Sequence, residues 1–384
     1  MTNRRIVLGV TAQMSLKLLG RIPETLVSRG WEVHIVASPS RGQISFPTIA
    51  GVHFHPLRMR REISVLSDLV AFFRWAQLMK RLKPTVALVG TPKAGLLGIL
   101  TSFLFQIPVR IYHLRGLRYE TEFGARRKLL FLLEKFAARL ATHVLAVSAS
   151  VRNIYVADGA CSQSKIHTIG EGASKGVDLK KFSPNPPSKL NDNEIRVMNA
   201  LDPTIPVIGF VGRLSVDKGV RILADALRIM VSRTIPVQLL CVGPDEIAGS
   251  AQAELLSAGA KVIFAGEVDN ASNYFKMMDI LCLPSFREGF PNVILEAQAS
   301  GVPVISSNAT GSIDAVQNNV TGLLYEKDSP RDLVNAVLRL LGDAELQTTL
   351  VQTAYQRVVT HYSDVHIASL TADFLERRSC SIDV

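Results

Sequence analysis

The chain alternates short apolar, β-rich runs with stretches of helical spacing, and this alternation occurs twice. In the first half, the predicted strands are residues 6–10, 32–37, 86–89, 109–113 and 143–147. In the second half, they are residues 207–211, 237–242, 262–265, 280–284 and 304–306. Strands that alternate with helices indicate parallel sheets whose faces are covered by helices. We therefore predict an α/β fold with two Rossmann-like, doubly wound domains.

A proline-rich segment separates the two halves. Five prolines lie among polar residues between positions 183 and 206, and such a composition resists both helix and central strand. The predicted parts are a domain of residues 1–185, a linker of residues 186–204, a domain of residues 205–365, and a C-terminal helix and tail of residues 366–384 that pack back on the first domain. Because ligands bind beyond the carboxyl ends of parallel strands, we expect the two domains to face each other across a substrate cleft.

The net charge of +10 is unevenly distributed. Residues 1–190 contain 28 Lys and Arg against 10 Asp and Glu, a net charge of +18, whereas the remainder contains 15 against 23, or −8. A basic first half favours an anionic partner such as phospholipid headgroups, a lipid-linked phosphate or nucleic acid. An ordinary solvated basic surface is the alternative.

The basic half also contains the helices that could meet a membrane. The predicted helical segments are residues 57–83, 93–105 and 125–140. The first carries cations around an apolar centre with Phe72, Phe73 and Trp75, as a helix on a membrane surface does. A buried helix whose cationic ends extend to solvent fits the same pattern.

No segment of the sequence suits a membrane span or an export signal. The apolar, uncharged run of 16 residues from 94 to 109 falls short of the roughly 20 residues that span a bilayer. The run at residues 6–10 is too short for the core of a signal peptide. Four widely spaced cysteines match no disulfide or metal framework, which favours reduced thiols. We expect a cytoplasmic protein, peripheral on the inner face of the cytoplasmic membrane.

A first charged motif runs from Gly212 to Gly219, between the predicted strand 207–211 and a helical pattern. Glycine lets the backbone approach a phosphate, and Arg213 and Lys218 can together hold a diphosphate near a helix N-terminus. A sugar nucleotide carries such a diphosphate. For this motif alone, an ordinary glycine-rich turn with a surface lysine is the alternative.

A second charged motif runs from Phe286 to Glu296 and follows the predicted strand 280–284. A glycine and a proline break the chain after Glu288, and a helical pattern then begins. Glu288 is therefore predicted in a loop, and Glu296 about one turn inside the helix. Two such carboxylates can accept hydrogen bonds from separate hydroxyl clusters, while the free N–H groups of the helix N-terminus point at a phosphate. A capping role or a surface ion pair is the alternative for Glu296.

These two motifs, in this order and at this separation, resemble the retaining glycosyltransferases of family 4, which have the GT-B fold. Nearly the whole chain fits this resemblance. Further segments resemble the branch that builds capsular, exopolysaccharide and O-antigen repeats: Thr91 to Gly95, Gly176 to Asp178 with Phe182 to Pro184, Glu288 to Asn292, and Ser300 to Val304. The resemblance implies a hexosyltransferase that uses a nucleotide-sugar donor and a lipid-linked (polyprenyl-diphosphate) glycan acceptor.

The resemblance also implies a role for each donor-site residue. Arg213 and Lys218 would grip the donor diphosphate, Glu296 would accept from the ribose hydroxyls, and Glu288 would hold the transferred sugar. Backbone groups of Phe290, Pro291, Asn292 and Val293 would line the same site, and the loop of Gly266, Glu267 and Val268 would lie against the nucleobase. Retention would follow from front-face departure and attack. No metal or other cofactor is expected, because the sequence has no Asp-x-Asp element or histidine cluster suited to a divalent cation.

The acceptor side departs from the family pattern. Members often carry a histidine directly before the glycine that follows the strand ending at Leu114, where it contacts the sugar, but this chain has Arg115 there. His113 lies two positions upstream and would share a strand face with Arg115, so either side chain could reach the substrate. A packed strand histidine is the alternative. Acceptor contacts are predicted for residues of post-strand loops: Thr11, Ser15, Lys93 and Arg118.

Other function classes fit the sequence less well. A dinucleotide-dependent dehydrogenase is disfavoured, because no G-x-G-x-x-G follows the first strand. Nucleic-acid binding is disfavoured, because the basic residues are spread over several helices without a recognised module. Two alternatives stay open: a non-catalytic partner subunit that binds a sugar nucleotide, and a sugar-nucleotide epimerase of the same architecture.

Overall fold

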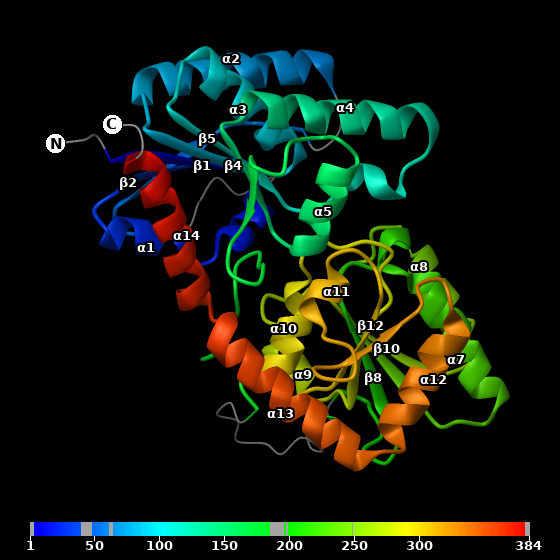
Figure 1. The fold of residues 1–384 in the computed structure, drawn as a ribbon. Coiled ribbons are helices and arrows are strands. Elements are labelled where there is room, and N and C mark those ends of the chain that lie inside the picture. Colours follow the sequence, from blue (N-terminus) through cyan, green and yellow to red (C-terminus); the bar gives the residue numbers. More distant parts are fainter. Residues whose placement is uncertain are drawn as a thin grey trace. The chain divides into compact units, whose positions relative to one another are not determined.

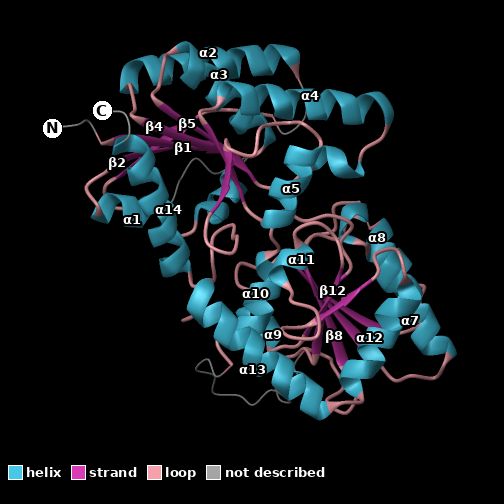
Figure 2. Cartoon of the chain, in the orientation of Figure 1, coloured by secondary structure: helices cyan, strands magenta, loops and turns pink. Residues whose placement is uncertain are grey.

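The computed structural model describes residues 4–39, 48–60, 64–184, 196, 199–247 and 249–380. The chain forms two compact units: unit 1 comprises Met1–Gly176 and Asp364–Val384, and unit 2 comprises Val177–Ser363. Each unit contains one parallel sheet with helices packed on it (Figure 1, Figure 2). The predicted α/β class with two parallel-sheet domains is confirmed.

The sheet of unit 1 has seven strands in the order β3-β2-β1-β4-β5-β6-β7. They are β1 (Arg5–Ala12), β2 (Glu32–Ser38), β3 (Val52–Pro56), β4 (Val86–Gly90), β5 (Val109–Leu114), β6 (His143–Ala146) and β7 (Ile166–Thr168). The sequence predicted the five inner strands, which are covered on both faces and therefore mostly apolar. It missed the two edge strands, because β3 carries His53 and His55 and β7 has only three residues.

Helices cover the two faces of this sheet over separate hydrophobic cores. They are η1 (Gln13–Leu19), α1 (Ile22–Ser28), α2 (Val65–Leu82), α3 (Pro92–Leu104), η2 (Arg118–Thr121), α4 (Gly124–Leu140), α5 (Ala149–Ala157) and α14 (Asp364–Cys380). Helices α2 to α5 pack on one face around Trp75 and Tyr155. Helices α1 and α14 pack on the other face around Leu26 and Leu375. The helix predicted from residue 57 begins at Val65 instead.

The C-terminal helix α14 belongs to unit 1, although unit 2 precedes it in the chain. Arg21 pairs with Asp364 at 2.9 Å, and Arg29 pairs with Asp373 at 2.5 Å. Leu375 is fully buried in the core that α14 shares with α1. Apolar burial and ion pairs thus hold the last helix on the first domain. It begins at Asp364, before the predicted start at residue 366.

The sheet of unit 2 has six strands in the order β10-β9-β8-β11-β12-β13. They are β8 (Val207–Val211), β9 (Gln238–Val242), β10 (Lys261–Gly266), β11 (Ile280–Leu283), β12 (Val304–Ser307) and β13 (Leu323–Tyr325). The helices are η3 (Val216–Lys218), α7 (Val220–Ser232), α8 (Ser250–Leu256), α9 (Ser272–Phe275), α10 (Asn292–Ala299), α11 (Ser312–Ala315), α12 (Pro330–Leu341) and α13 (Ala344–His361). The sequence predicted five of these strands and missed the short edge strand β13.

The boundary between the units lies before the proline-rich segment. The Val177 N–H donates to the Tyr362 carbonyl at 2.8 Å, and Phe182 packs edge-on against Phe275, so this stretch belongs to unit 2 and not to a first domain ending at residue 185. Most of the predicted linker, residues 186–204, lies outside the described residues. Its described end packs on unit 2, where Leu201 is buried. A proline-rich segment predicts irregular backbone. It does not predict the domain boundary, which lies where few residue contacts connect the two units.

Candidate functional site

The two charged motifs lie at the carboxyl ends of adjacent strands in the middle of the unit 2 sheet. Strand β8 pairs with β11, with Ile208 opposite Ile280. The Phe286 N–H donates to the Asp217 carbonyl at 3.0 Å, which ties the loop after β11 to the loop after β8. Because parallel strands end at the same edge of a sheet, the two motifs form one site.

Gly219 permits the close approach of these two loops. Its φ of +74° lies in the left-handed region, and a Cβ atom at this position would lie 1.9 Å from the Pro284 carbonyl oxygen. Glycine alone satisfies both conditions without strain. Gly219 also separates η3 from α7, and Lys218 is thereby held beside the loop that follows β11.

Lys218 and Glu288 form the centre of the site. The Lys218 Nζ lies 2.5 Å from Glu288 Oε1, and the Ser285 hydroxyl donates to the same oxygen at 2.7 Å. The lysine and glutamate side chains are 18% and 11% exposed, so each charge is compensated mainly by the other. The Glu288 N–H donates to the Thr310 carbonyl at 2.9 Å, which holds the loop backbone. The fold thus joins a cation and a carboxylate that lie 70 positions apart.

Arg213 lies in the same loop as Lys218 and is held by acidic residues. Its guanidinium pairs with Glu246 and lies 3.5 Å from Asp217, which also pairs with Arg287 at 3.6 Å. Burial acts to raise the pKa of Asp217, but the Ser215 hydrogen bond and the neighbouring cations lower it below its ordinary value. Asp217 is therefore ionised at neutral pH and orients two arginines. Sequence reasoning gave Asp217, Glu246 and Arg287 no role, because spacing does not show which charges face one another.

The start of α10 adjoins this cluster through the loop that carries Glu288. The Asn292 Oδ1 atom is buried and meets no hydrogen-bond donor among the described residues. Phe290 is buried with its ring centroid 5.5 Å from that of Tyr362, so its side chain serves the core and only its backbone is available to a ligand. Glu296 lies half-buried in the second turn. The N–H groups at this helix start favour a bound anion.

The loop predicted to face the nucleobase lies further out along the same edge of the sheet. Gly266 ends β10, and its carbonyl accepts from the Gly243 N–H at 2.8 Å. Strand β9 lies between β10 and β8. Gly266 and the half-buried Val268 are therefore one strand removed from the ion-paired cluster, and their contact with a base stays a prediction.

In unit 1, two predicted acceptor residues serve internal structure. Thr11 lies within β1, where its hydroxyl is 2.7 Å from the Thr91 hydroxyl and accepts from the Ala94 N–H at 3.1 Å. Lys93 lies in the first turn of α3, with its Nζ 2.7 Å from Asp68 Oδ1. The prediction that Thr11 lies in a post-strand loop is wrong, because β1 extends to Ala12. Lys93 lies in the helix predicted over residues 93–105 and not in a loop before it, and its contact with the acceptor stays a prediction.

The remaining acceptor and metal predictions stay predictions. Ser15 lies in η1 and Arg118 opens η2, and both are half-buried. Within the described ranges, no three His, Cys, Asp or Glu side chains are grouped so that they could hold a metal ion. In the same ranges, no helix is long and apolar enough to cross a bilayer.

His113 and Arg115 lie at the carboxyl end of β5 in unit 1. His113 is 5% exposed, and burial, followed by the charge of Arg115, holds its pKa well below the usual range. One terminal nitrogen of Arg115 donates to the Ser174 hydroxyl at 2.9 Å, and its Nε is buried without a hydrogen-bond partner among the described residues. Burial lowers the pKa of Arg115 to about 10, so it stays charged at neutral pH while His113 is neutral.

Comparison with known proteins agrees with this architecture. A family model described as "Glycosyl transferases group 1" matches residues 205–343, and one described as "Glycosyl transferase 4-like domain" matches residues 19–172. The capsular polysaccharide biosynthesis glycosyltransferase CapM of Staphylococcus aureus is 33% identical over 366 residues, which cover 94% of each chain. An Escherichia coli relative, named UDP-Gal:alpha-D-GlcNAc-diphosphoundecaprenol alpha-1,3-galactosyltransferase, is 27% identical over 293 residues and 74% of each chain.

Solved structures show the same fold. Sucrose-phosphate synthase from Thermosynechococcus elongatus matches with a TM-score of 0.82 at 19% identity, over 98% of this chain and all of the other. At this identity the likeness concerns the fold alone. The resemblance inferred from the motifs is confirmed, and the chain belongs to the family of group 1 and 4-like glycosyltransferases with the GT-B fold.

Proposed function

We propose that this glycosyltransferase acts in the synthesis of a cell-surface polysaccharide. It moves a sugar, with retention and without a metal ion, from a nucleotide-diphosphate donor to a lipid-linked (polyprenyl-diphosphate) glycan. The observation that carries the proposal is the Lys218–Glu288 pair, which lies beside Arg213 at the carboxyl ends of β8 and β11. Such a site holds one cation for a phosphate and one carboxylate for sugar hydroxyls in direct contact.

The donor would bind by replacing contacts that these residues now make with one another. The Lys218 ammonium and the Arg213 guanidinium would turn to the diphosphate, together with the N–H groups at the start of α10. Glu288 would then accept hydrogen bonds from the transferred sugar. Two protein cations and a helix N-terminus stabilise the charge that develops on the leaving diphosphate, which is the main demand of this chemistry. Glu296 and the buried Asn292 Oδ1 offer acceptors to the ribose or sugar hydroxyls.

Relatives and charge support the acceptor assignment. The Escherichia coli relative is named for a diphosphoundecaprenol-linked acceptor, and the Staphylococcus aureus relative for capsular polysaccharide biosynthesis. A lipid-linked diphosphate is anionic and membrane-bound, and residues 1–190 carry a net charge of +18. Arg115, charged and held by Ser174, takes the position of the histidine that family members often carry there. The proposed location is the inner face of the cytoplasmic membrane, to which unit 1 would attach.

Transfer assays with a set of donors test the proposal. UDP-, GDP- and dTDP-sugars would be offered to the purified chain, with and without a polyprenyl-diphosphate glycan, in the presence of a chelator. We expect one donor class to give an acceptor-dependent product whose new linkage keeps the anomeric configuration of the donor sugar. An epimerase would convert the donor without any acceptor, and a non-catalytic subunit would show only a rise in melting temperature with the nucleotide sugar.

A matched pair of variants tests the site itself. Glu288→Ala removes the carboxylate from the centre of the site, whereas Glu345→Ala removes an exposed carboxylate at the start of α13. We expect Glu288→Ala to lose transfer by about 100-fold or more, as when a preorganised polar group is lost, and Glu345→Ala to retain it. Near-normal turnover by a folded Glu288→Ala protein would exclude this site assignment.

A further inference from the structure

Helix α2 is apolar on two opposite faces. One face packs on the sheet through Ala71, Trp75, Leu78, Met79 and Leu82, which are buried. The opposite face exposes Val65, Leu66, Leu69, Val70 and Phe73, of which Val65 and Leu66 are 79% and 80% exposed. These five follow the helical period as a single stripe. An ordinary surface helix carries polar residues on this outer face, so the apolar stripe requires another explanation.

Helix α4 carries a second exposed stripe, in which apolar and cationic residues alternate. Leu129, Leu132 and Phe136 are exposed, and Lys128, Lys135 and Arg139 lie between them on the same side of the helix. Phe123, directly before the helix, is 87% exposed. Leu and Phe beside Lys and Arg on one helix face are typical of a helix that lies in the interface of an anionic membrane.

Helix α3 joins the two stripes into one surface. It contacts α2 on one side and α4 on the other, and all three helices pack on the same face of the sheet (Figure 1). At the end of α3, Phe103, Leu104 and Phe105 are exposed. We call the outer surface of these three helices the docking face. Its exposed apolar side chains lie together in stripes, whereas an ordinary protein surface exposes such side chains singly and scattered.

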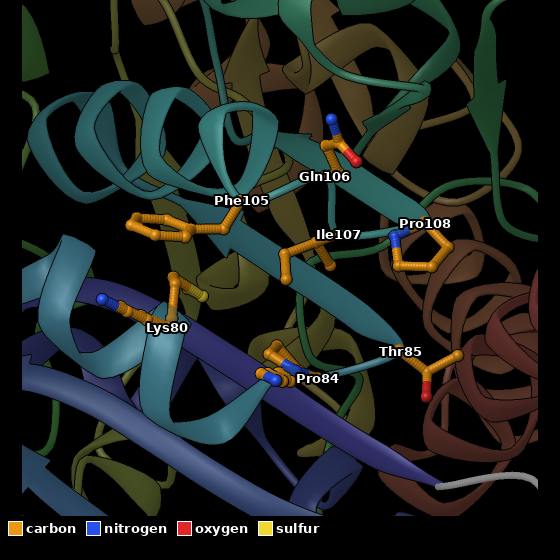
Figure 3. A pocket seen from close by; sticks show the side chains of 9 residues that line it. Lys80, Pro84, Thr85, Phe105, Gln106, Ile107 and Pro108 are labelled. Carbon is orange, nitrogen blue, oxygen red and sulfur yellow. The ribbon is translucent and has the colours of Figure 1, made fainter.

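A pocket at the carboxyl ends of α2 and α3 continues this chemistry. Apolar Pro84 and Ile107 line it together with Lys80 and the exposed Phe105, as Figure 3 shows. Lys83 is a further lining residue. The docking face therefore ends in a hollow that combines apolar walls with two lysines, which suits a lipid whose acyl part is apolar and whose headgroup is anionic.

Charge identifies the partner of the docking face. Helices α2, α3 and α4 contain nine Lys and Arg against two Asp and Glu. Of the acids on α2 and α4, Asp68 is paired with Lys93, and Glu134 is buried and accepts from the Tyr112 hydroxyl at 2.7 Å. A second copy of the chain would place cations against cations, which disfavours self-association. An anionic bilayer offers acyl chains to the apolar side chains and negatively charged headgroups to the cations.

We propose that the docking face inserts its apolar side chains into an anionic lipid bilayer, while its lysines and arginines contact lipid phosphates. This inference specifies the proposed membrane location and does not depend on the donor site, which lies in unit 2. Binding by apolar insertion as well as charge is expected to outlast salt concentrations that abolish attachment by charge alone.

Flotation with lipid vesicles tests the docking face on the full chain. The vesicles would be phosphatidylcholine alone, or phosphatidylcholine with about one third phosphatidylglycerol. We expect the chain to bind the anionic vesicles and to bind the neutral ones at least about tenfold more weakly, since each cation at an anionic surface adds a several-fold factor. Equal binding to both vesicles, or none to either, would overturn the proposal.

Two double variants separate the docking face from apolar exposure in general. Leu66→Ser with Phe73→Ser, and Leu132→Ser with Phe136→Ser, should each weaken binding to anionic vesicles by about tenfold or more, because each change removes one large side chain from the bilayer. The control is Leu256→Ser with Val365→Ser, at residues exposed to a similar degree on α8 and α14. All six residues are already exposed, so we expect each double variant to keep the melting temperature.

Charge reversal completes the test. Lys128→Glu with Lys135→Glu should weaken vesicle binding. The control, Lys261→Glu with Arg331→Glu, changes the net charge of the chain by the same amount but at positions on unit 2, and it should not weaken binding. Transfer to a water-soluble acceptor analogue should be unchanged in every variant, which separates a failure of docking from a failure of the proposed function. Vesicle binding equal to that of the controls, or a wild-type dimer that the serine variants dissociate while vesicle binding persists, would overturn the proposal.

Discussion

The carboxyl edges of the two sheets contain similar residue types but use them differently. At the edge of the unit 2 sheet, Lys218, Glu288 and Arg213 pair with charged residues of other post-strand loops. At the edge of the unit 1 sheet, Thr11 supports the start of α3 and Lys93 is paired with Asp68 of α2. One edge therefore concentrates charges that a ligand can take over. The other uses its polar groups to hold its own helices.

This difference shows that a position after a parallel strand does not by itself make a binding residue. Lys93 and Lys218 both follow such strands, and both are ion-paired. The partner of Lys93 is a helical residue whose carboxylate also accepts from the Ser64 N–H, and so belongs to the structure of α2. The partner of Lys218 lies in a loop beside a helix N-terminus, where a diphosphate can replace it.

The largest expected difference is in turnover, between alanine variants of these two lysines. Lys218→Ala should lower turnover by about 100- to 1000-fold, because it removes a cation that stabilises the leaving diphosphate. Lys93→Ala, its counterpart in unit 1, should lower turnover by less than about tenfold, since its ammonium serves Asp68. Initial rates at saturating donor and acceptor would measure both. Lys218→Arg, which keeps the charge, should recover part of the loss, and equal losses in the two alanine variants would abolish the contrast.

Arg115 is the residue of unit 1 for which we expect the strongest effect on transfer. Arg115→Ala should lower kcat/KM for the acceptor by about 10- to 100-fold, the value of a charge-assisted hydrogen bond, while slow hydrolysis of the donor continues at its normal rate. Arg115→His introduces the residue that family members often carry and should retain more activity. Full acceptor kinetics in a folded Arg115→Ala protein would instead assign Arg115 a structural role through Ser174.

Thr11 should affect stability and not chemistry. Thr11→Val removes the hydroxyl that accepts from the Ala94 N–H, which leaves buried polar groups without a partner at a cost of about 1 to 3 kcal/mol. Urea unfolding would measure this loss. The exposed Thr353→Val on α13 is the matched control and should change stability little. A normal free energy of unfolding combined with a raised KM for the acceptor would restore the acceptor role that the sequence suggested.

The smallest expected effect is that of His113 on how the free energy of unfolding depends on pH. Because its folded pKa is well below the ordinary value, the unfolded chain takes up a proton that the folded chain does not once the pH falls below about 6.5. Stability is therefore full above that pH and declines below it, by at most about 1.4 kcal/mol per pH unit for one group. His113→Gln should show a shallower decline between neutral and mildly acidic pH in urea unfolding. The exposed His366→Gln should keep the wild-type slope.

Local sequence pattern predicted the elements that hold the donor site. Strand β8 was predicted with its observed bounds, and β11 to within one residue. A parallel strand that helices cover on both faces appears in the sequence as a short, continuous apolar run, so its ends can be read from the sequence. The charged residues that follow these strands were therefore placed in post-strand loops correctly. The end of β1 was placed wrongly, because Thr11 is a polar residue whose partner Thr91 lies after another strand. The helix over residues 93–105 was predicted to within one residue, but the pairing of Lys93 with Asp68 was not predicted, because Asp68 lies on another helix.

The sequence by itself determined two parallel-sheet domains, the family to which the chain belongs, and the charged residues at the ends of β8 and β11. Only the tertiary structure decided which charges meet. Lys218 is ion-paired with Glu288 because Gly219 and Pro284 approach so closely that no side chain fits between them. Lys93 is ion-paired with Asp68 because α2 and α3 pack side by side. Strand and helix patterns come from neighbouring residues, whereas ion pairs between distant residues depend on how those elements pack.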